Sequence, residues 1–222
     1  MTKIIKRCFW CEGDSLYEKY HDKEWGTPCR DDRKLFEMLI LESFQAGLSW
    51  RTILYKRPHF KKAFQNFNVH KISQFTESDI KRLLNNKGII RNRLKIEAAI
   101  NNAQKFLQTQ KEFGTFAKYI WQFAPKKSKK IYSRLSLLAT TKESDRMAED
   151  IKNRDFKFLG STTCYAFMQS VGMVNDHITG LFLSNLHSGR PYDFFLSTRI
   201  ILWRFVKLNI RKEKVSKGCF KF

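Results

Sequence analysis

The apolar segment 31–48 constrains the fold more than any other part of the sequence. It reads DDRKLFEMLILESFQAGL, with acidic residues at its start and an apolar run after them. Acidic side chains in the first turn of a helix are favoured by the helix dipole. We therefore predict one long apolar helix over these residues.

Helical patterns also dominate the rest of the sequence, and no convincing alternation of apolar and polar residues predicts a strand. Ser15 and Glu18 have the spacing of a capping box, which predicts a helix that runs to about Lys23. Thr76 and Asp79 have the same spacing before another helix. The other predicted helices cover 50–55, 58–67, 91–110, 116–123, 144–154 and 161–171. The predicted fold class is all-α.

The charge of the chain points to a polyanionic partner. Lysine and arginine total 42 against 21 acidic residues, for a formal net charge of +21. A surface this basic attracts nucleic acid through counterion release. A general bias towards lysine would give the same numbers, so charge alone leaves both explanations open.

Composition and length indicate a chain that builds its own core. With 222 residues, 42% of them hydrophobic and 20 of them phenylalanine, it forms one large domain or two small ones without disulfides. The five cysteines are unevenly spaced and follow no secretory leader, which predicts a reducing compartment, the cytoplasm. No apolar stretch is long enough to predict a transmembrane helix.

The turn within 83–96, LLNNKGIIRNRLKI, is a candidate DNA contact. Two predicted helices meet there, and Gly88 can supply the positive φ of a tight turn. The second helix begins with free backbone N–H groups, which bind anions, and Arg91, Arg93 and Lys95 follow directly. The pattern resembles the helix-hairpin-helix motif, which holds a DNA phosphate through hairpin amides. A plain turn between helices explains the same residues, so both interpretations stay open.

Glu42 interrupts the apolar run of segment 31–48. A buried carboxylate is costly unless it is paired or used in a site, but Glu42 also lies within about 1.5 turns of Glu37, which allows a narrow exposed stripe.

Nearer the N-terminus, Tyr17 and Tyr20 share one helical face, with Trp50 flanking the region. Ordinary core packing accounts for such a face, and so does a site that stacks a flipped base.

Zinc-type ligands occur towards both ends of the sequence. Cys8 and Cys11 form a C-x2-C pair, His21 follows, and His177 lies in the apolar run VGMVNDHITGLFLSNL. Zinc takes Cys and His at four tetrahedral positions. A single C-x2-C is a weak signal, and a histidine in an apolar run is commonly a core residue. The residues alone therefore leave the metal open.

Five motifs together resemble a known family. They are RCFW (7–10), LYEKYHDKEWG (16–26), LFEMLILESFQAGLSW (35–50), NNKGIIRNRLKI (85–96) and FKFLGSTTCYAFMQSVGMVNDH (156–177). From about Lys6 to Leu186 the chain closely resembles the type I 3-methyladenine DNA glycosylases, small bacterial enzymes of base-excision repair. The resemblance implies an all-α helix-hairpin-helix glycosylase fold, with a zinc site that ties the N-terminal and C-terminal parts together.

The same resemblance implies roles for individual residues. Glu42 matches the glutamate of the base-binding pocket. The base-stacking aromatic residues match Tyr17, Tyr20 and Trp50. The hairpin at Gly88 would hold the DNA backbone.

The implied zinc ligands are Cys8, His21 and His177. One position departs from the family's His-x3-Cys pattern, because Leu181 stands where the cysteine ligand is expected. The candidates for a fourth ligand are Cys11, Cys164, His187, Cys219 and a water molecule.

The function implied by the resemblance is that of a monofunctional DNA N-glycosylase, without lyase activity. It would extrude an alkylated base from double-stranded DNA and hydrolyse the N-glycosidic bond of 3-methyladenine. We expect a monomer with no stable protein partner and no membrane association. Two alternatives are a catalytically inactive DNA-binding or damage-recognition protein of the same fold, and a membrane-associated protein acting through its C-terminal part.

The predicted domain organisation has two parts. Residues 1–187 would form the glycosylase domain. Residues 188–222 would form a basic and apolar extension of unknown role, which the family usually lacks.

Overall fold

The computed structural model describes residues 7–126, 131, 133 and 136–178. In these ranges the chain forms helices α1 (Ser15–Lys23), α2 (Asp32–Gln45), α3 (Trp50–Ala63), η1 (Gln65–Phe67), α4 (Val69–Ile72), α5 (Glu77–Leu84), α6 (Arg93–Phe113), α7 (Phe116–Ile120), η2 (Trp121–Phe123), α8 (Lys142–Asn153) and α9 (Ser161–Ser170). The extended pairing found there is an isolated bridge between Ile131 and Ile178. The all-α prediction is therefore confirmed for the described residues.

Several predictions concern residues outside these ranges. They are the extension 188–222, Leu181, His187 and Cys219. Among the described residues, no helix combines the length and hydropathy needed to cross a membrane.

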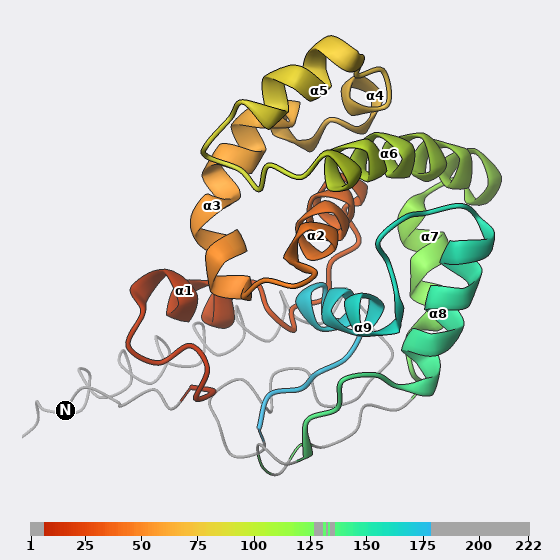
Figure 1. Ribbon diagram of the computed structural model, residues 1–222. Helices are drawn as coiled ribbons and strands as arrows, with labels where there is room; N and C mark the ends of the chain where they lie inside the picture. The colour runs from red at the N-terminus through yellow and green to blue at the C-terminus, as the bar shows by residue number, and fades with distance from the viewer. Residues whose placement is uncertain (1–6, 127–130, 132, 134–135, 179–222) are drawn as a thin grey trace, which may run out of the picture. The chain divides into compact units, whose positions relative to one another are not determined.

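Helix α2 occupies the centre of the described structure. It runs between α6 on one side and α9 on the other (Figure 1), and it also packs against α3 and α7. A helix that is apolar on most of its faces belongs in a core, and residues 35–44 of α2 are all buried except Glu37. Its buried apolar side chains are Leu35, Phe36, Met38, Leu39, Ile40, Leu41 and Phe44.

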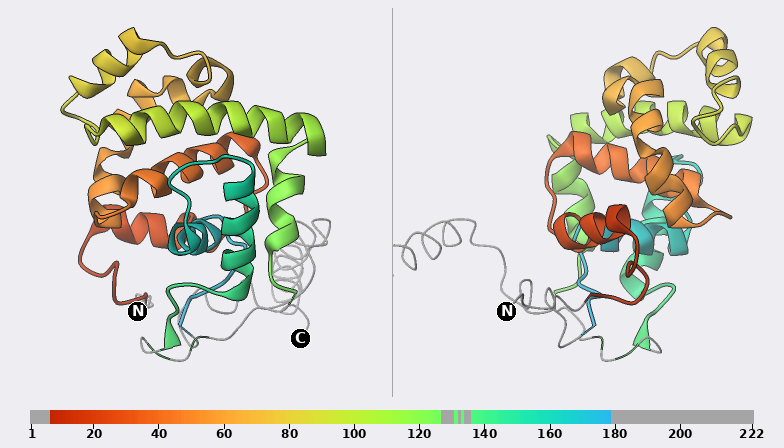
Figure 2. Two further views of the ribbon diagram at one scale, coloured as in Figure 1. Left: turned by 45° about the vertical axis from the view of Figure 1, so that its right-hand side comes forward. Right: turned by 90° about the vertical axis from the view of Figure 1, so that its left-hand side faces the viewer.

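The short helices α4 and α5 form one end of this structure, against α6 (Figure 2), and η1 lies between α4 and α3. Aromatic packing joins this end to the centre. The ring of Phe64 stacks on that of Phe60 at a centroid distance of 5.9 Å and on that of Phe67 at 6.5 Å. These contacts hold η1 against the end of α3.

Residues 50–63 form one continuous helix, α3, so the prediction of two separate helices there is wrong. Pro58 lies inside α3, where its ring removes one backbone donor. Ile53 and Leu54 precede this proline and Phe60 follows it, and all three side chains are buried in the same core. Tertiary packing on both sides of Pro58 therefore keeps the helix continuous.

Capping residues fix where the helices start. Asp14, and not Ser15, caps α1, because its carboxylate accepts hydrogen bonds from the backbone N–H groups of Leu16 and Tyr17, both at 3.1 Å. The predicted capping box at Thr76 is confirmed.

Gly172 ends α9 in a left-handed conformation, with φ of +70°. A Cβ atom at this position would lie 2.3 Å from the carbonyl carbon of Thr27. Backbone hydrogen bonds hold the two segments together, from Gly26 N–H to Gln169 C=O at 2.9 Å and from Cys29 N–H to Val171 C=O at 3.0 Å. This close approach brings the end of α9 against the segment that follows α1.

We expect Gly172→Ala to lower the free energy of unfolding by about 2–4 kcal/mol, because the new methyl group strains the backbone and displaces Thr27. Urea denaturation would measure the loss. Gly13→Ala is the matched control, because Gly13 has φ of +80° but nothing within 4 Å of its added Cβ. It separates the cost of the backbone conformation from that of the contact. Equal losses in both variants would contradict the importance of this contact.

Candidate functional site

Glu42 is buried within α2, with 4% of its surface exposed. It therefore does not share an exposed stripe with Glu37, whose carboxylate instead accepts a hydrogen bond from Arg57 Nε at 2.7 Å. Burial raises the pKa of the Glu42 carboxyl to about 8, although a hydrogen bond with Ser170 acts in the opposite direction. A carboxyl with this pKa carries its proton at neutral pH.

Ser170 is a member of the site that sequence analysis missed. It is the last residue of α9 and is buried, and its hydroxyl donates a hydrogen bond to the carbonyl of Phe167 at 2.9 Å. In the sequence it is one small polar residue in an apolar helix, and only the packing of α9 against α2 makes it a neighbour of Glu42.

The aromatic residues predicted from the sequence gather around Glu42. The rings of Tyr20 and Trp50 lie 5.3 Å apart between centroids. Burial raises the pKa of Tyr20, and the nearby carboxyl of Glu42 raises it further. Burial likewise raises the pKa of Tyr17 to about 12, with a smaller contribution from Glu42. We call these four residues, Tyr17, Tyr20, Glu42 and Trp50, the Glu42 cluster.

Two polar atoms of the Glu42 cluster have no hydrogen-bond partner. In the part of the chain that the structure describes, Oε2 of Glu42 and Nε1 of Trp50 are buried and unpaired. Buried polar groups in proteins are nearly always paired, and an unpaired one calls for an explanation. A carboxyl oxygen and an indole N–H beside two aromatic rings, tilted by 46° to each other, can meet the polar edge and the faces of a heteroaromatic ligand.

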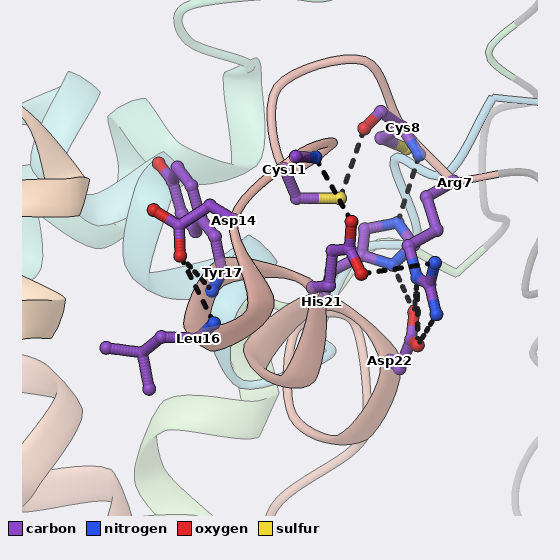
Figure 3. A network of polar contacts seen from close by, with 10 residues as sticks. Arg7, Cys8, Cys11, Asp14, Leu16, Tyr17, His21 and Asp22 are labelled. Atoms are coloured by element: carbon purple, nitrogen blue, oxygen red, sulfur yellow. Dashed lines mark hydrogen bonds and ion pairs between the residues drawn. The ribbon is translucent and has the colours of Figure 1, made fainter.

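Cys8, His21 and His177 are far apart in the sequence but neighbours in the structure. The N–H of Cys8 donates to Nε2 of His21 at 3.4 Å (Figure 3), and the rings of His21 and His177 lie 4.9 Å apart between centroids. The thiol of Cys8 also accepts a backbone hydrogen bond from Ile178. The segment before α1 therefore lies against the segment that follows α9.

The donor atoms of these residues are not arranged as a metal-ligand set. Nε2 of His21 is engaged with Cys8, and Nδ1 lies 2.9 Å from the carboxylate of Asp22 (Figure 3). Nowhere among the described residues do three or more Cys, His, Asp or Glu side chains form a group suited to a metal. Of the proposed fourth ligands, Cys164 points its thiol at the carbonyl of Leu159, at 3.5 Å. The zinc site thus stays a prediction.

The connection between α5 and α6, residues 85–92, is the predicted hairpin. Gly88 does not have a positive φ, so that part of the prediction is wrong. A glycine is needed here for space, since an added Cβ would lie 2.9 Å from Cβ of His59. The ammonium group of Lys56 donates to the carbonyl of Lys87 at 3.1 Å. The hairpin is therefore packed directly on α3.

The three cationic residues that follow Gly88 have different surroundings. Arg91 is exposed, whereas Arg93 pairs with Glu77 at 2.7 Å and with Glu97 at 3.1 Å. Lys95 is buried, with 7% of its surface exposed, and its ammonium donates to backbone carbonyls. This burial is unfavourable for the predicted DNA contact of Lys95. For Arg91 and Arg93 the DNA contact remains a prediction.

Comparison with known proteins identifies the family. The methyladenine glycosylase family model matches residues 10–184. The chain belongs to this family. DNA-3-methyladenine glycosylase 1 of Escherichia coli (strain K12) is 44% identical over 178 residues, which cover 79% of this chain and 95% of that protein.

Solved structures of the same family have the same fold. A crystal structure of 3-methyladenine DNA glycosylase I superposes with a TM-score of 0.77 at 46% identity, covering 80% of this chain and 98% of that one. A tyrosine-to-phenylalanine variant of 3-methyladenine DNA glycosylase I, solved in complex with 3-methyladenine, gives a TM-score of 0.76 at 34% identity. That match covers 79% of this chain and 96% of the other.

We expect Glu42→Gln to stabilise the protein increasingly as the pH rises. The folded-state pKa of about 8 lies above the usual 4.5, so the folded protein binds more protons than the unfolded chain between these values. The wild type therefore loses stability across this window, by about 3–5 kcal/mol, whereas glutamine does not titrate. Urea denaturation of both proteins from about pH 5 to about pH 8 measures the difference.

Glu37→Gln on the same helix is a control of opposite sign. Hydrogen bonding and charge pairing with Arg57 outweigh burial and lower the pKa of Glu37. The stability that the Glu37 carboxylate contributes is therefore present above its unfolded pKa and lost in acid. Glu37→Gln should be less stable than the wild type at neutral pH, and the difference in free energy of unfolding should shrink as the pH falls. A pH-independent difference for Glu42→Gln would contradict the buried, protonated carboxyl.

Proposed function

We propose that this protein is a DNA-3-methyladenine glycosylase, which hydrolyses the N-glycosidic bond of 3-methyladenine in double-stranded DNA. The observation that carries the proposal is the unpaired carboxyl oxygen of Glu42, buried beside Tyr20 and Trp50 in a chain of the methyladenine glycosylase family. The names of its relatives favour an active glycosylase over an inactive DNA-binding protein of the same fold.

The chemistry of the lesion matches this site. Methylation at N3 gives the base a positive charge, so that it departs as a neutral molecule and the glycosidic bond is already labile. A cation next to Glu42 favours the ionised carboxylate and lowers the pKa that burial has raised. The carboxylate then hydrogen-bonds the edge of the base and stabilises its charge. The aromatic rings of Tyr20 and Trp50 attract the same cation through their faces.

Selectivity follows from the same electrostatics. Unmodified adenine brings no positive charge, so Glu42 would stay protonated beside it and offer no ion pair. The bond of unmodified adenine is also harder to break. We therefore assign most of the discrimination to binding at the Glu42 cluster, with no need for a nucleophilic side chain or lyase chemistry.

The hairpin at residues 85–92 supplies the DNA contact in this proposal. Its backbone N–H groups and the exposed Arg91 would hold a phosphate while the nucleotide is extruded towards the Glu42 cluster. The high positive charge of the chain supports association with a polyanion.

The test is the release of 3-methyladenine from alkylated duplex DNA. We expect Glu42→Ala to slow release about 100-fold or more, because the charge-stabilising group is lost. Trp50→Ala should slow it by about 5–30-fold, the value of one cation–π contact of about 1–2 kcal/mol. Glu149→Gln, on the exposed side of α8, is the control and should release the base at the wild-type rate. If both site variants release the base at the wild-type rate, the assignment of Glu42 and Trp50 to the base-binding site is wrong.

We also propose a structural zinc ion held by Cys8, His21 and His177. The proximity of the three residues supports it, although binding would require Nε2 of His21 to give up its hydrogen bond with Cys8. Zinc would tie the segment before α1 to the segment after α9, and it would take no part in bond cleavage.

Elemental analysis of the purified protein tests the zinc proposal. We expect about one zinc ion per chain, lost in Cys8→Ser and in His177→Ala together with a fall in melting temperature. Cys11→Ser then decides whether Cys11 is the fourth ligand in place of the cysteine missing at position 181. If the wild type is folded and metal-free, and a chelator leaves its melting temperature unchanged, the zinc proposal is wrong.

The remaining expectations accompany this function as proposals. They are a monomeric state, action in the cytoplasm where the DNA is, and a separate role for the extension 188–222.

A further inference from the structure

Lys95 is a buried lysine with an unusual pair of partners. It lies in the first turn of α6, and its ammonium donates to the carbonyl of Phe44 at 2.8 Å and to that of Ala46 at 2.6 Å. Burying an ammonium group is costly unless it is well hydrogen-bonded. Desolvation accordingly lowers the pKa of Lys95. A lysine kept in such a place has a structural or functional reason to be there.

The two carbonyls belong to the C-terminal end of α2. The last carbonyls of a helix lack partners within it and carry the negative end of the helix dipole. The last turn of α2 contains no basic residue of its own, and its cap residue Ala46 leaves the helical conformation, with φ of −46° and ψ of 117°. Lys95 therefore supplies from α6 the positive charge and the donors that α2 does not provide.

This end of α2 leads directly into the site. Residues 44–50, which we call the α2–α3 corner, connect the helix that carries Glu42 to Trp50, the first residue of α3. Within the corner, Gly47 has φ of +79°, and Leu48 N–H donates to the carbonyl of Gln45 at 2.6 Å. Fixing the carbonyls of Phe44 and Ala46 therefore fixes the spacing between the carboxyl of Glu42 and the indole of Trp50.

The same lysine is attached to the hairpin. The N–H of Lys95 donates to the side chain of Asn92, the N-cap of α6, at 3.1 Å. Asn92 is also the last residue of the hairpin. One residue thus joins the predicted DNA contact, through its backbone, to the α2–α3 corner, through its side chain.

We propose that Lys95 is a positioning residue, which holds Glu42 and Trp50 in register through the end of α2 and does not contact DNA phosphate. The proposal rests on the proposed function. Release of 3-methyladenine by the wild type tests that function first, so that the two can fail separately.

The test compares Lys95→Met with the wild type in single-turnover release at saturating enzyme and in DNA binding at several salt concentrations. Methionine keeps an unbranched apolar stem and removes the charge and the donors. We expect release at saturation to slow by about 10–100-fold, the effect of misplacing catalytic groups by about 1 Å. DNA affinity should stay within about twofold, with an unchanged salt dependence, because no phosphate contact is lost.

Two variants frame this result. Lys105→Met makes the same substitution further along α6, where the ammonium pairs with Asp155 at 3.3 Å, and should release the base at the wild-type rate. Arg91→Met removes the exposed hairpin cation, so its main effect should fall on DNA affinity, with a salt slope smaller by about 1. If Lys95→Met instead weakens DNA binding and lowers the salt slope while keeping the saturating rate, Lys95 is a phosphate contact and the proposal is overturned.

Hydrogen exchange gives a readout that does not depend on activity. Backbone amides of the α2–α3 corner should exchange faster in Lys95→Met than in the wild type, while those of α8 should not change. Unchanged exchange in the corner would overturn the proposal. If the methionine variant does not fold, Lys95→Gln, which keeps an N–H donor group but not the charge, undergoes the same measurements, and a smaller change of the same kind is expected.

Discussion

The burial of the Glu42 carboxyl inside an apolar helix is the constraint on which the site depends. Water cannot solvate the charge there, so the group keeps a proton until a cation arrives or a donor is provided. Helix α9 supplies one partner, Ser170, while the second carboxyl oxygen stays unpaired. A site built this way costs stability when it is empty. That cost is consistent with a group kept for binding rather than for folding.

Ion pairs hold together the helices that carry the Glu42 cluster. Arg57 of α3 donates to Glu24 after α1, at 2.8 Å, and to Glu37 of α2, at 2.7 Å. Lys34 joins the same group through Glu24 at 2.7 Å. Because Tyr20, Glu42 and Trp50 lie on α1, α2 and α3, this network holds the helices of the cluster to one another. Lys95 acts on the opposite end of α2.

The segment after α9 is held by contacts that need no metal. Asp176 is buried and accepts hydrogen bonds from Tyr165 and Gln169, both at 2.7 Å. His177 follows and packs on the ring of Trp25 at 4.6 Å between centroids. A Cβ on Gly26 would lie 2.7 Å from its Cε1 atom. The acid and the histidine in that apolar run thus have separate reasons to be there, one in hydrogen bonding and one in close packing.

The sequence by itself determined the all-α class, a long apolar helix within residues 31–48 and a capped helix after Thr76. It also named the aromatic and acidic residues that the structure brings together, whose roles stay a prediction. Caps, apolar periodicity and acidic first turns act within a few residues, so local sequence expresses them. It could not decide whether Glu42 is buried, because that depends on α9, more than a hundred residues away. The continuity of α3 through Pro58 and the burial of the Lys95 side chain likewise depend on packing partners from distant segments. Burial and pairing are properties of the assembled helices, and only the tertiary structure decided them.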